Sequence, residues 1–557
     1  MGMFISRLAS SRRTLLAAAV CAAMSGFSAA FGAHAASGNL LDVASCADDG
    51  SPDTLRAAIE GASDGDTIDL RNLSCSLIAL SAPLLVPVAN LTMLGPGSDA
   101  LTVDGNDIYR VLQGSSLDIQ GLTIANGRAS GSGACILGDK LSLTDTVLTH
   151  CVNFGATGAV GGAAFVTGDL TMHDASISGS GAAGTTYAMG GAAFVGGAAT
   201  LYDSIISSNS VQAGGMAYGG AISANGSITL HASTIEGNSA QASTGSAYGG
   251  GLHSFGGDIS ILDRSTVSSN SSRSDLTWAY GGGINAGTGM APAGIVTVRN
   301  STITGNSVSS ACSACLVSGG GIRAFDSIAA EAATFSYNEA TCDDSASQCS
   351  TGGGGLAAFG QSPSSAITLS NTTVSGNTSI GGTAIGAIGA GGGVIGGTGL
   401  RIVAHNSTIA FNDASTLGGG IAAVTSGGTP SELVSTIVAY NHNSGGAGDI
   451  GAGPFGTELV LEGSHSLVTA SDAGVTLPAD TMTEEPLLLP LTTDNGGVTA
   501  THALAAGSPA IDTGANPDSL FSDQRGFPHH RVVGASADIG AYELDGDPSI
   551  FADDFDP

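Results

Sequence analysis

The chain has 557 residues, of which 87 are glycine, and 46 acidic against 15 basic side chains give a formal net charge of −31. Its 42% hydrophobic content supplies enough apolar material for a core, which excludes an intrinsically disordered chain. Glycine occurs in clusters and not at every third position, which excludes collagen. The strong negative charge argues against nucleic acid as a partner.

Residues 1–35 have the order of a secretory signal peptide: Arg7, Arg12 and Arg13, then an apolar run, then small residues ending at Ala35. We expect cleavage after Ala35. The Arg12-Arg13 pair fits either a twin-arginine or an ordinary export signal. The predicted location is therefore extracellular or at the outer-membrane surface, reached through the periplasm. No later apolar run reaches about 18 residues, so no transmembrane helix is expected in the mature chain.

Residues 36–90 are predicted to form an N-terminal cap. Ser51, with Pro52 after it, is expected to begin a short helix in which Leu55, Ala58 and Ile59 share one face. Such a helix suits a lid over the first turn of a repeat structure, whose strand edge would otherwise be exposed.

Residues 91–455 contain a recurring phrase: a glycine pair or triplet, a short apolar strand, Ser-Thr-Ile or a relative, two residues and Asn. One copy runs from Gly219 to Asn238 and the next from Gly249 to Asn270. The intervals between successive Asn are 29, 32, 36, 32, 39 and 35 residues, which indicates a constant rung with variable loops. These residues are Asn209, Asn238, Asn270, Asn306, Asn338, Asn377 and Asn412.

The strands of each rung span only three to five residues, too few to bury a face alone, so the rungs must stack. If each segment pairs with the same segment of the next rung, every backbone N–H and C=O group of these strands has a hydrogen-bond partner. Glycine would form the sharp turns between successive strands of a rung. Asn would tolerate the left-handed conformation and bond its counterpart in the next rung. This predicts an all-β parallel β-helix, a solenoid with a short N-terminal helical cap and a C-terminal β cap. A β-propeller would need longer strands and more than 5% aromatic residues.

One column of predicted outward positions is polar or aromatic, four residues before the buried residue of each Ser-Thr-Ile strand. It is either a solvated face or a groove that binds a glycan or a protein partner along the solenoid. If it is a groove, replacing His231 and Arg299 with Ala should weaken binding without unfolding. The members are His173, Tyr202, His231, Asp263, Arg299, Glu331, Ser370 and His405.

Eight cysteines remain after the leader, an even number that suits disulfides in an oxidising compartment. Disulfides among the first four cysteines would hold the N-terminal cap and an early rung in place. The last four occupy the same loop on neighbouring rungs, so bridges within each loop and bridges between rungs are both possible. A thioredoxin-like redox role is disfavoured because the βαβ context is missing. A four-cysteine zinc site is disfavoured because the two cysteines of the second pair are too far apart in the sequence. The predicted early pairs are Cys46 with Cys75 and Cys135 with Cys151, and the later four are Cys312, Cys315, Cys342 and Cys349.

Residues 456–545 are predicted to form the C-terminal cap. Arg525 has a choice of acidic partners, which indicates either a structural ion pair that closes the last rung or a calcium site. Those partners are Asp512, Asp523, Asp538 and Glu543. Residues 546–557 form an acidic tail, for which we expect disorder or a role as a sorting tag.

The rungs resemble the repeats of polymorphic outer membrane proteins, as in Gly-Gly-Ala-Ile at residues 219–222 and Phe-x-x-Asn at residues 335–338. The resemblance covers roughly residues 90–450. Because the passenger of that family is a right-handed β-helix, it implies the same handedness here.

The front of the chain resembles the CSLREA-type opening of bacterial surface β-helix proteins, through Cys46 and residues 54–59 and 65–68. Asp53 and Ala57 stand where that family has Cys and Glu. The back resembles the choice-of-anchor Q domain, through Asp-Asn-Gly-Gly, Gly-Ser-Pro-Ala-Ile-Asp, Asp-Gln-Arg-Gly and Asp-Ile-Gly-Ala-Tyr-Glu in that order. Both resemblances imply a secreted or cell-surface protein.

Polysaccharide lyases and glycoside hydrolases use the same fold, and their chemistry needs clustered carboxylates. Single-rung pairs such as Asp104 with Asp107, and Asp263 beside Arg264, do not repeat the motif set of polygalacturonase-like hydrolases. No Gly-x-Ser-x-Gly elbow stands in a strand-to-helix setting. We therefore predict a non-enzymatic, adhesin-like exported protein without a cofactor. The alternatives are a polysaccharide-active enzyme and a structural surface spacer.

Overall fold

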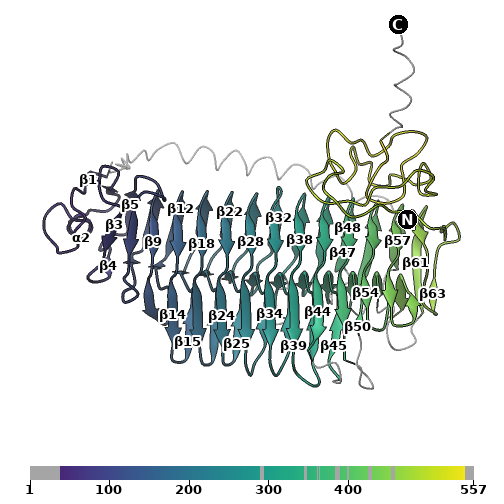
Figure 1. Ribbon diagram of the computed structural model, residues 1–557, viewed down its shortest axis with the longest axis horizontal. Helices are drawn as coiled ribbons and strands as arrows, with labels where there is room; N and C mark the ends of the chain where they lie inside the picture. The colour runs from purple at the N-terminus through teal and green to yellow at the C-terminus, as the bar shows by residue number, and fades with distance from the viewer. Residues whose placement is uncertain are drawn as a thin grey trace, which may run out of the picture.

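The computed structural model describes residues 38–545 except 289–293, 344–347, 361, 363, 383–388, 398–399, 424–429 and 453–457. The predicted signal peptide (residues 1–35) and acidic tail (residues 546–557) lie outside the described residues. The described chain is a parallel β-helix, as the repeat predicts, and its strands form five long sheets. The rungs stack along a rod (Figure 1). Among the strands of the described residues, β58 (His442–Asn443) and β59 (Gly446–Ala447) are the one antiparallel pair, and three isolated antiparallel bridges lie in the C-terminal segment.

One rung visits the five sheets in a fixed order, and we number the sheets I to V in that order. In the rung that ends with Ser254, the chain passes from sheet I to sheet II, out through sheets III and IV, and back through sheet V. Its strands are β27 (Ile228–His231), β28 (Thr234–Glu236), β29 (Ser239–Ala242), β30 (Ala247–Tyr248) and β31 (Leu252–Ser254).

Each sheet stacks the equivalent strand of successive rungs. In the described residues the sheets have 16, 14, 12, 8 and 13 strands. Their first and last strands are β1 (Leu40–Asp42) and β63 (Val475–Thr476) in sheet I, β3 (Leu77–Ala79) and β62 (Leu467–Val468) in sheet II, β10 (Arg128–Ser130) and β59 in sheet III, β15 (Gly158–Val160) and β50 (Gly389–Ala390) in sheet IV, and β4 (Leu84–Leu85) and β60 (Ile450–Ala452) in sheet V.

Sheets I, II and V enclose the main hydrophobic core, and we call this part the body. Alternation along each strand produces this core: Ile228 and Leu230 of β27 point inward and are fully buried, whereas Thr229 and His231 are partly exposed. Ile, Leu and Val dominate the core from Val43 to Val468. The stacking therefore buries continuous columns of aliphatic side chains.

Sheets III and IV pack against each other outside the body, and we call this two-layer projection the flange. Its strands form the lower row in Figure 1. The flange core contains small side chains, such as Ala182, Ala217 and Ala240, and in later rungs cysteines. Glycine allows the sharp return from the flange to the body. Gly249 has a φ of +65°, and a Cβ on Gly250 would approach the carbonyl oxygen of Gly282 too closely.

The N-terminal cap contains the predicted helix, but the helix begins later than predicted. Helix α2 spans Leu55–Glu60, and the side chain of Thr54 caps it by accepting a hydrogen bond from the amide of Ala57. The prediction that it begins at Ser51 is wrong because Asp53 has a φ of +70°, which is incompatible with a helix. Leu55 and Ile59 are buried in the first rung, as predicted.

The C-terminal residues extend the helix and then fold back. Strand β61 (Leu459–Ser464) continues sheet I, whereas residues 478–545, all of them described, contribute only isolated bridges. This irregular segment lies beside sheet II: Thr334 donates to the carbonyl of Ala500, and the amide of Ala541 donates to Thr408 Oγ1. It covers the side of the last rungs, where the final part of the coloured chain lies in Figure 1.

Candidate functional site

The predicted outward column is on the exposed face of sheet I. Strand register places His173 opposite Tyr202 and Tyr202 opposite His231. Their rings stack at centroid distances of 4.6 and 4.9 Å with nearly parallel planes. Farther along, Arg299, Glu331, Ser370 and His405 continue the column.

The placement of Asp263 in this column is wrong. Leu262 is opposite His231, and Asp263 follows in the turn. Asp263 and Arg264 both have positive φ, so this turn contains one extra residue, and counting back from the next buried residue misplaces the column by one. Asp263 still reaches the column, because its Oδ2 lies 2.6 Å from His231 Nδ1.

Other members of the column are paired within the chain. Arg299 Nε donates to Glu331 Oε2 at 2.8 Å, and both side chains are about half exposed. His405 is covered by the C-terminal segment, and its Nδ1 lies 3.0 Å from Asp518 Oδ1. The polar side chains of Arg299, Glu331 and His405 therefore already make contacts within the chain, and a ligand would compete with these contacts.

The predicted Asn column is present and buried. The amide and the side-chain Nδ2 of each Asn both donate to Oδ1 of the next, as Asn270 does to Asn306 at 3.0 Å. The column ends at Asp449, whose Oδ1 accepts from Asn441 and whose Oδ2 accepts from Thr469 and the amide of Ala470. Burial raises the pKa of Asp449. The hydrogen-bonded members of the Asn column are Asn209, Asn238, Asn270, Asn306, Asn338, Asn377, Asn412 and Asn441.

The left-handed conformation predicted for these Asn residues is wrong. The residue before each Asn has the positive φ, as in Gly237 at +63° and Ser269 at +56°. That residue makes the corner, which leaves the Asn side chain free to point inward. The column therefore marks the junction of the body and the flange.

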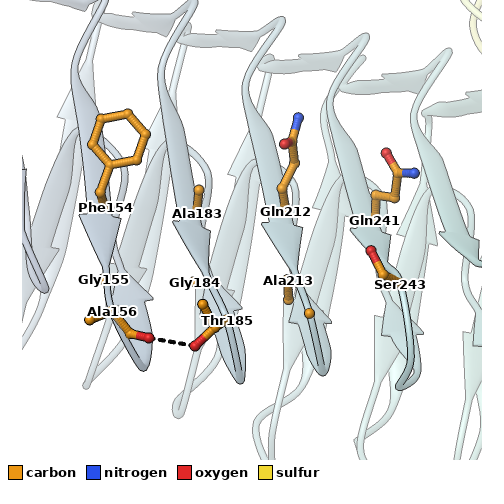
Figure 2. A pocket seen from close by; sticks show the side chains of 11 residues that line it. Phe154, Gly155, Ala156, Ala183, Gly184, Thr185, Gln212, Ala213, Gln241 and Ser243 are labelled. Carbon is orange, nitrogen blue, oxygen red and sulfur yellow. Dashed lines mark hydrogen bonds between the residues drawn. The ribbon is translucent and has the colours of Figure 1, made fainter.

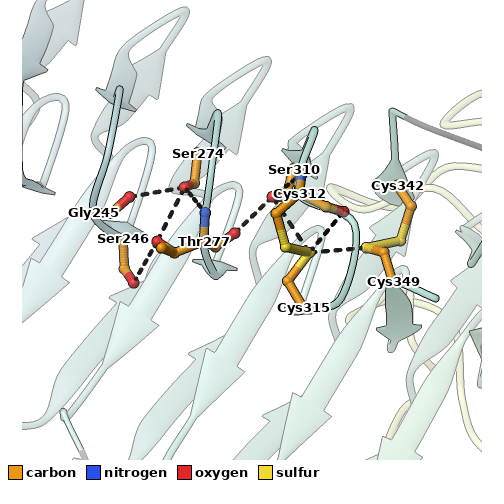
Figure 3. The surroundings of a disulfide bond; sticks show 9 residues. All are labelled: Gly245, Ser246, Ser274, Thr277, Ser310, Cys312, Cys315, Cys342 and Cys349. Atoms are coloured by element: carbon orange, nitrogen blue, oxygen red, sulfur yellow. Dashed lines mark hydrogen bonds between the residues drawn. A yellow bond between two sulfur atoms is a disulfide. The ribbon is translucent and has the colours of Figure 1, made fainter. Parts of the chain in front are cut away.

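The structure contains four disulfides, and each of the two later bridges lies within one loop and does not join two rungs. Cys46 bonds Cys75 at the cap, and Cys135 bonds Cys151 in an early rung, as predicted. The later bridges join Cys312 to Cys315 and Cys342 to Cys349. Figure 3 shows these two bridges side by side, with the sulfur atoms of Cys315 and Cys349 3.2 Å apart. They belong to the flange core, which in these rungs also contains Ala279, Val308 and Val317.

Arg525 pairs with two carboxylates in the C-terminal segment. Its guanidinium lies 2.8 Å from Asp523 and 2.9 Å from Asp545. Glu543 pairs instead with Arg531 at 2.8 Å, and burial raises the pKa of Glu543 to about 7. These contacts tie the segment together beside sheet II.

The other two predicted partners of Arg525 accept hydrogen bonds from backbone amides. Asp512 accepts from Ala535, and Asp538 accepts from Asp512 and Leu544. Within the described ranges no group of three or more His, Cys, Asp or Glu side chains is placed to hold a metal ion. Calcium binding stays a prediction.

Sequence reasoning missed a hollow on the outer face of sheet III (Figure 2). Phe154, Ala183, Gln212 and Gln241 are opposite one another on four successive rungs. Their strands are β14 (Val152–Gly155), β19 (Gly181–Gly184), β24 (Ser210–Ala213) and β29. The hollow measures about 650 Å³ and is lined by uncharged residues alone.

Phe154 forms one end of this hollow. Its side chain is 42% exposed, and the guanidinium of Arg128 lies 4.6 Å from the ring centroid. Ala183, on the next rung, is too small to cover the ring, and the exposed amides of Gln212 and Gln241 follow. The available signal was an isolated Phe in front of a run of Gly, Ala and Thr at residues 155–159. This signal is weak because the segment has the composition of a loop.

The strand register defines a protein of the parallel β-helix class. No protein-family model, curated protein or solved structure matches the chain. In the part of the chain that the structure describes, no helix is long and apolar enough to cross a membrane.

Proposed function

We propose that the protein is an exported, non-enzymatic, adhesin-like solenoid that binds a glycan at a cell surface. The predicted signal peptide supports export, and the resemblance to CSLREA-type, polymorphic outer membrane and choice-of-anchor Q proteins supports a surface location. The elongated fold supports a binding role because solenoids present long side surfaces to a partner.

The observation that carries the proposal is the hollow beside Phe154. An aromatic ring offers a flat apolar face for the C–H surface of a sugar, and side-chain amides both donate to and accept from hydroxyl groups. Gln212 and Gln241 lie two and three rungs from Phe154. Because rungs repeat at about 4.8 Å, close to the length of one pyranose unit, the row fits successive sugars of a linear chain.

The residues that line the hollow are uncharged, and the Arg128 guanidinium at its end is already in contact with the Phe154 ring, which favours a neutral glycan. Concave sites with a few placed polar groups are the usual form of a small-ligand site. The body's outward column remains a second place for a ligand, but its His231–Asp263 and Arg299–Glu331 contacts already occupy several of its polar atoms.

The proposal is tested by incubating the mature protein with neutral bacterial and plant polysaccharides and reading both retention and new reducing ends. We expect retention without cleavage, at least tenfold weaker in Phe154→Ala and in Gln212→Ala with Gln241→Ala. Ile380→Ala is the matched control, because Ile380 is exposed in the same sheet but outside the hollow.

The other outcomes identify the alternatives. New reducing ends or unsaturated products would establish a polysaccharide-active enzyme. Loss of retention in His231→Ala with Arg299→Ala, but not in Phe154→Ala, would place the binding site on the body. No retention of any glycan would leave a protein partner or a spacer role.

A further inference from the structure

Three polar side chains are buried on the outer side of sheet V, where the tyrosines of sheet IV cover them. His253, Asn285 and Arg323 are opposite one another on successive rungs, in β31, β36 (Ile284–Ala286) and β41 (Ile322–Ala324). They are 0%, 0% and 4% exposed. The middle residue of these strands points away from the body core, so these side chains occupy the corner between the body and the flange.

Arg323 has aromatic neighbours but no acidic partner among the described residues. Its guanidinium carbon lies 3.8 Å from the ring centroid of Tyr280 and 3.9 Å from that of Phe325. Its one hydrogen-bond contact there runs from Nη1 to Asn285 Oδ1 at 3.4 Å, and Nε has no partner. Burial lowers the pKa of Arg323 to about 10, so the side chain stays charged at neutral pH. A buried cation without an anion is unfavourable unless something neutralises it.

Two further buried groups at this corner can donate a hydrogen bond but have no partner among the described residues. Asn285 Nδ2 lies 3.1 Å from His253 Nδ1 and donates to it, so the ring proton is assigned to His253 Nε2. Burial lowers the pKa of His253 to about 3, which keeps the ring neutral at pH 7. In the described part of the chain, His253 Nε2 has no hydrogen-bond partner, and neither has the hydroxyl of Ser318, which is on the same rung as Arg323. Unsatisfied donors beside a cation call for an acceptor with negative charge.

Aromatic residues connect this corner to the surface. Trp278 is 52% exposed, and its ring centroid lies 6.3 Å from that of Tyr280, which in turn contacts Arg323. A sugar could pack on the exposed ring of Trp278 while an attached carboxylate approaches the guanidinium beside Tyr280, which is itself only 6% exposed. The chain's net charge of −31 disfavours a polyanion, so a ligand with a single carboxylate fits best.

We infer that Arg323, with Asn285, His253 and the exposed ring of Trp278, binds the carboxylate of a glycan that carries isolated acidic sugar residues. This inference rests on the proposed glycan-binding function and adds a second site with a different ligand chemistry. The hollow on sheet III takes the neutral chain, and the corner of sheets IV and V takes the acidic residue.

The test uses Trp278, the single tryptophan of the chain, as a fluorescent reporter. The mature protein is titrated with methyl β-glucuronide and with the neutral methyl β-glucoside, and the unfolding temperature is recorded in parallel. We expect a saturable change in Trp278 emission and a higher unfolding temperature with the glucuronide, and at least tenfold weaker binding of the glucoside.

Arg323→Met removes the charge and keeps an unbranched apolar side chain, and it should lower glucuronide affinity at least tenfold. Arg264→Met, at an exposed arginine in the turn after sheet I, is the control and should bind as wild type does. If Arg323→Met does not fold, Trp278→Ala provides the same test through the unfolding temperature, because Trp278 lies at the exposed entrance.

Three results would overturn the inference: no response of the wild type to the glucuronide, equal affinity in Arg323→Met, or a response to a glutamate-containing peptide in place of the sugar. Failure of the proposed function can be distinguished from failure of this inference. Loss of neutral-glycan retention in Phe154→Ala should leave the Trp278 response intact, and a Trp278 response without any neutral-glycan retention would refute the hollow alone.

Discussion

The body and the flange are built from the same rungs but are stabilised differently. The body encloses large aliphatic side chains such as Ile228 and Leu230, whereas the flange brings two sheets together over alanine, as at Ala217 and Ala240. The body gains stability from buried apolar area, and the flange depends on close approach, hydrogen bonds and covalent bridges. One repeat can thus support both a stable rod and a thin projection, and the projection carries the proposed binding surfaces.

The largest expected effect is on the body. Phe335→Ala removes a fully buried ring from sheet II and should lower the free energy of unfolding by about 3–5 kcal/mol. Phe154→Ala is the matched control on the flange, because that ring is 42% exposed, and it should cost less than about 1 kcal/mol. Chemical denaturation measures both. Equal losses would contradict the contrast between the two regions.

The next effect is at the junction of body and flange. Asn306→Ala removes the acceptor for the amide and side chain of Asn270, and each buried donor left unpaired should cost about 1–3 kcal/mol. Asn225→Ala, on an exposed turn, should stay within about 0.5 kcal/mol. Thermal unfolding of the two variants compares them. A wild-type midpoint for Asn306→Ala would show that the column contributes no stability.

A smaller effect is expected within the flange. Replacing Cys342 and Cys349 with Ala opens a bridge with a sequence separation of 7, which should cost on the order of 2 kcal/mol. Faster hydrogen exchange should be confined to the neighbouring flange rungs, including Val308. The same change at Cys46 and Cys75, with a separation of 29, should cost more. Uniformly faster exchange along the body would contradict a local role.

The smallest effect concerns pH and the N-terminal cap. Hydrogen bonds from Arg71 lower the pKa of Asp69 from 3.8 to about 2. Because the folded state binds this proton less readily than the unfolded state, the stabilisation is present above about pH 4 and is lost as the pH falls toward 2. Arg71→Ala should weaken this dependence, measured as unfolding temperature between pH 5 and 2.5. An unchanged pH profile would show that the pair contributes nothing.

The body could be predicted from the sequence, and the flange could not. Paired glycines, Ser-Thr-Ile strands and the Asn column each have a distinct signature, so the stacking and its axis follow from them. The strands of sheets III and IV contain Ala, Ser and Gly, with two to four residues each, and such segments have the composition of loops. The predicted variable insertions are therefore largely these flange strands and their tips.

The same reason explains which site residues were missed. Phe154 and Trp278 lie in segments that carried no strand signal, and Arg323 follows three glycines as one polar residue in an apolar strand. Its burial depends on Tyr280, 43 residues earlier in the sequence, which no local pattern reveals. Asp263 was misplaced because a single extra turn residue shifts the register without changing the repeated phrase.

The Asn column also determines how the molecule can change in length. Every Asn donates toward the C-terminal end and accepts from the N-terminal side, so all its members are interchangeable. Insertion or deletion of a whole rung between Asn209 and Asn441 would restore every bond. Asp449 can only accept, which makes it a terminus beyond which no equivalent rung can be added. Reach can therefore evolve by duplication of internal rungs, while both ends of the rod stay fixed.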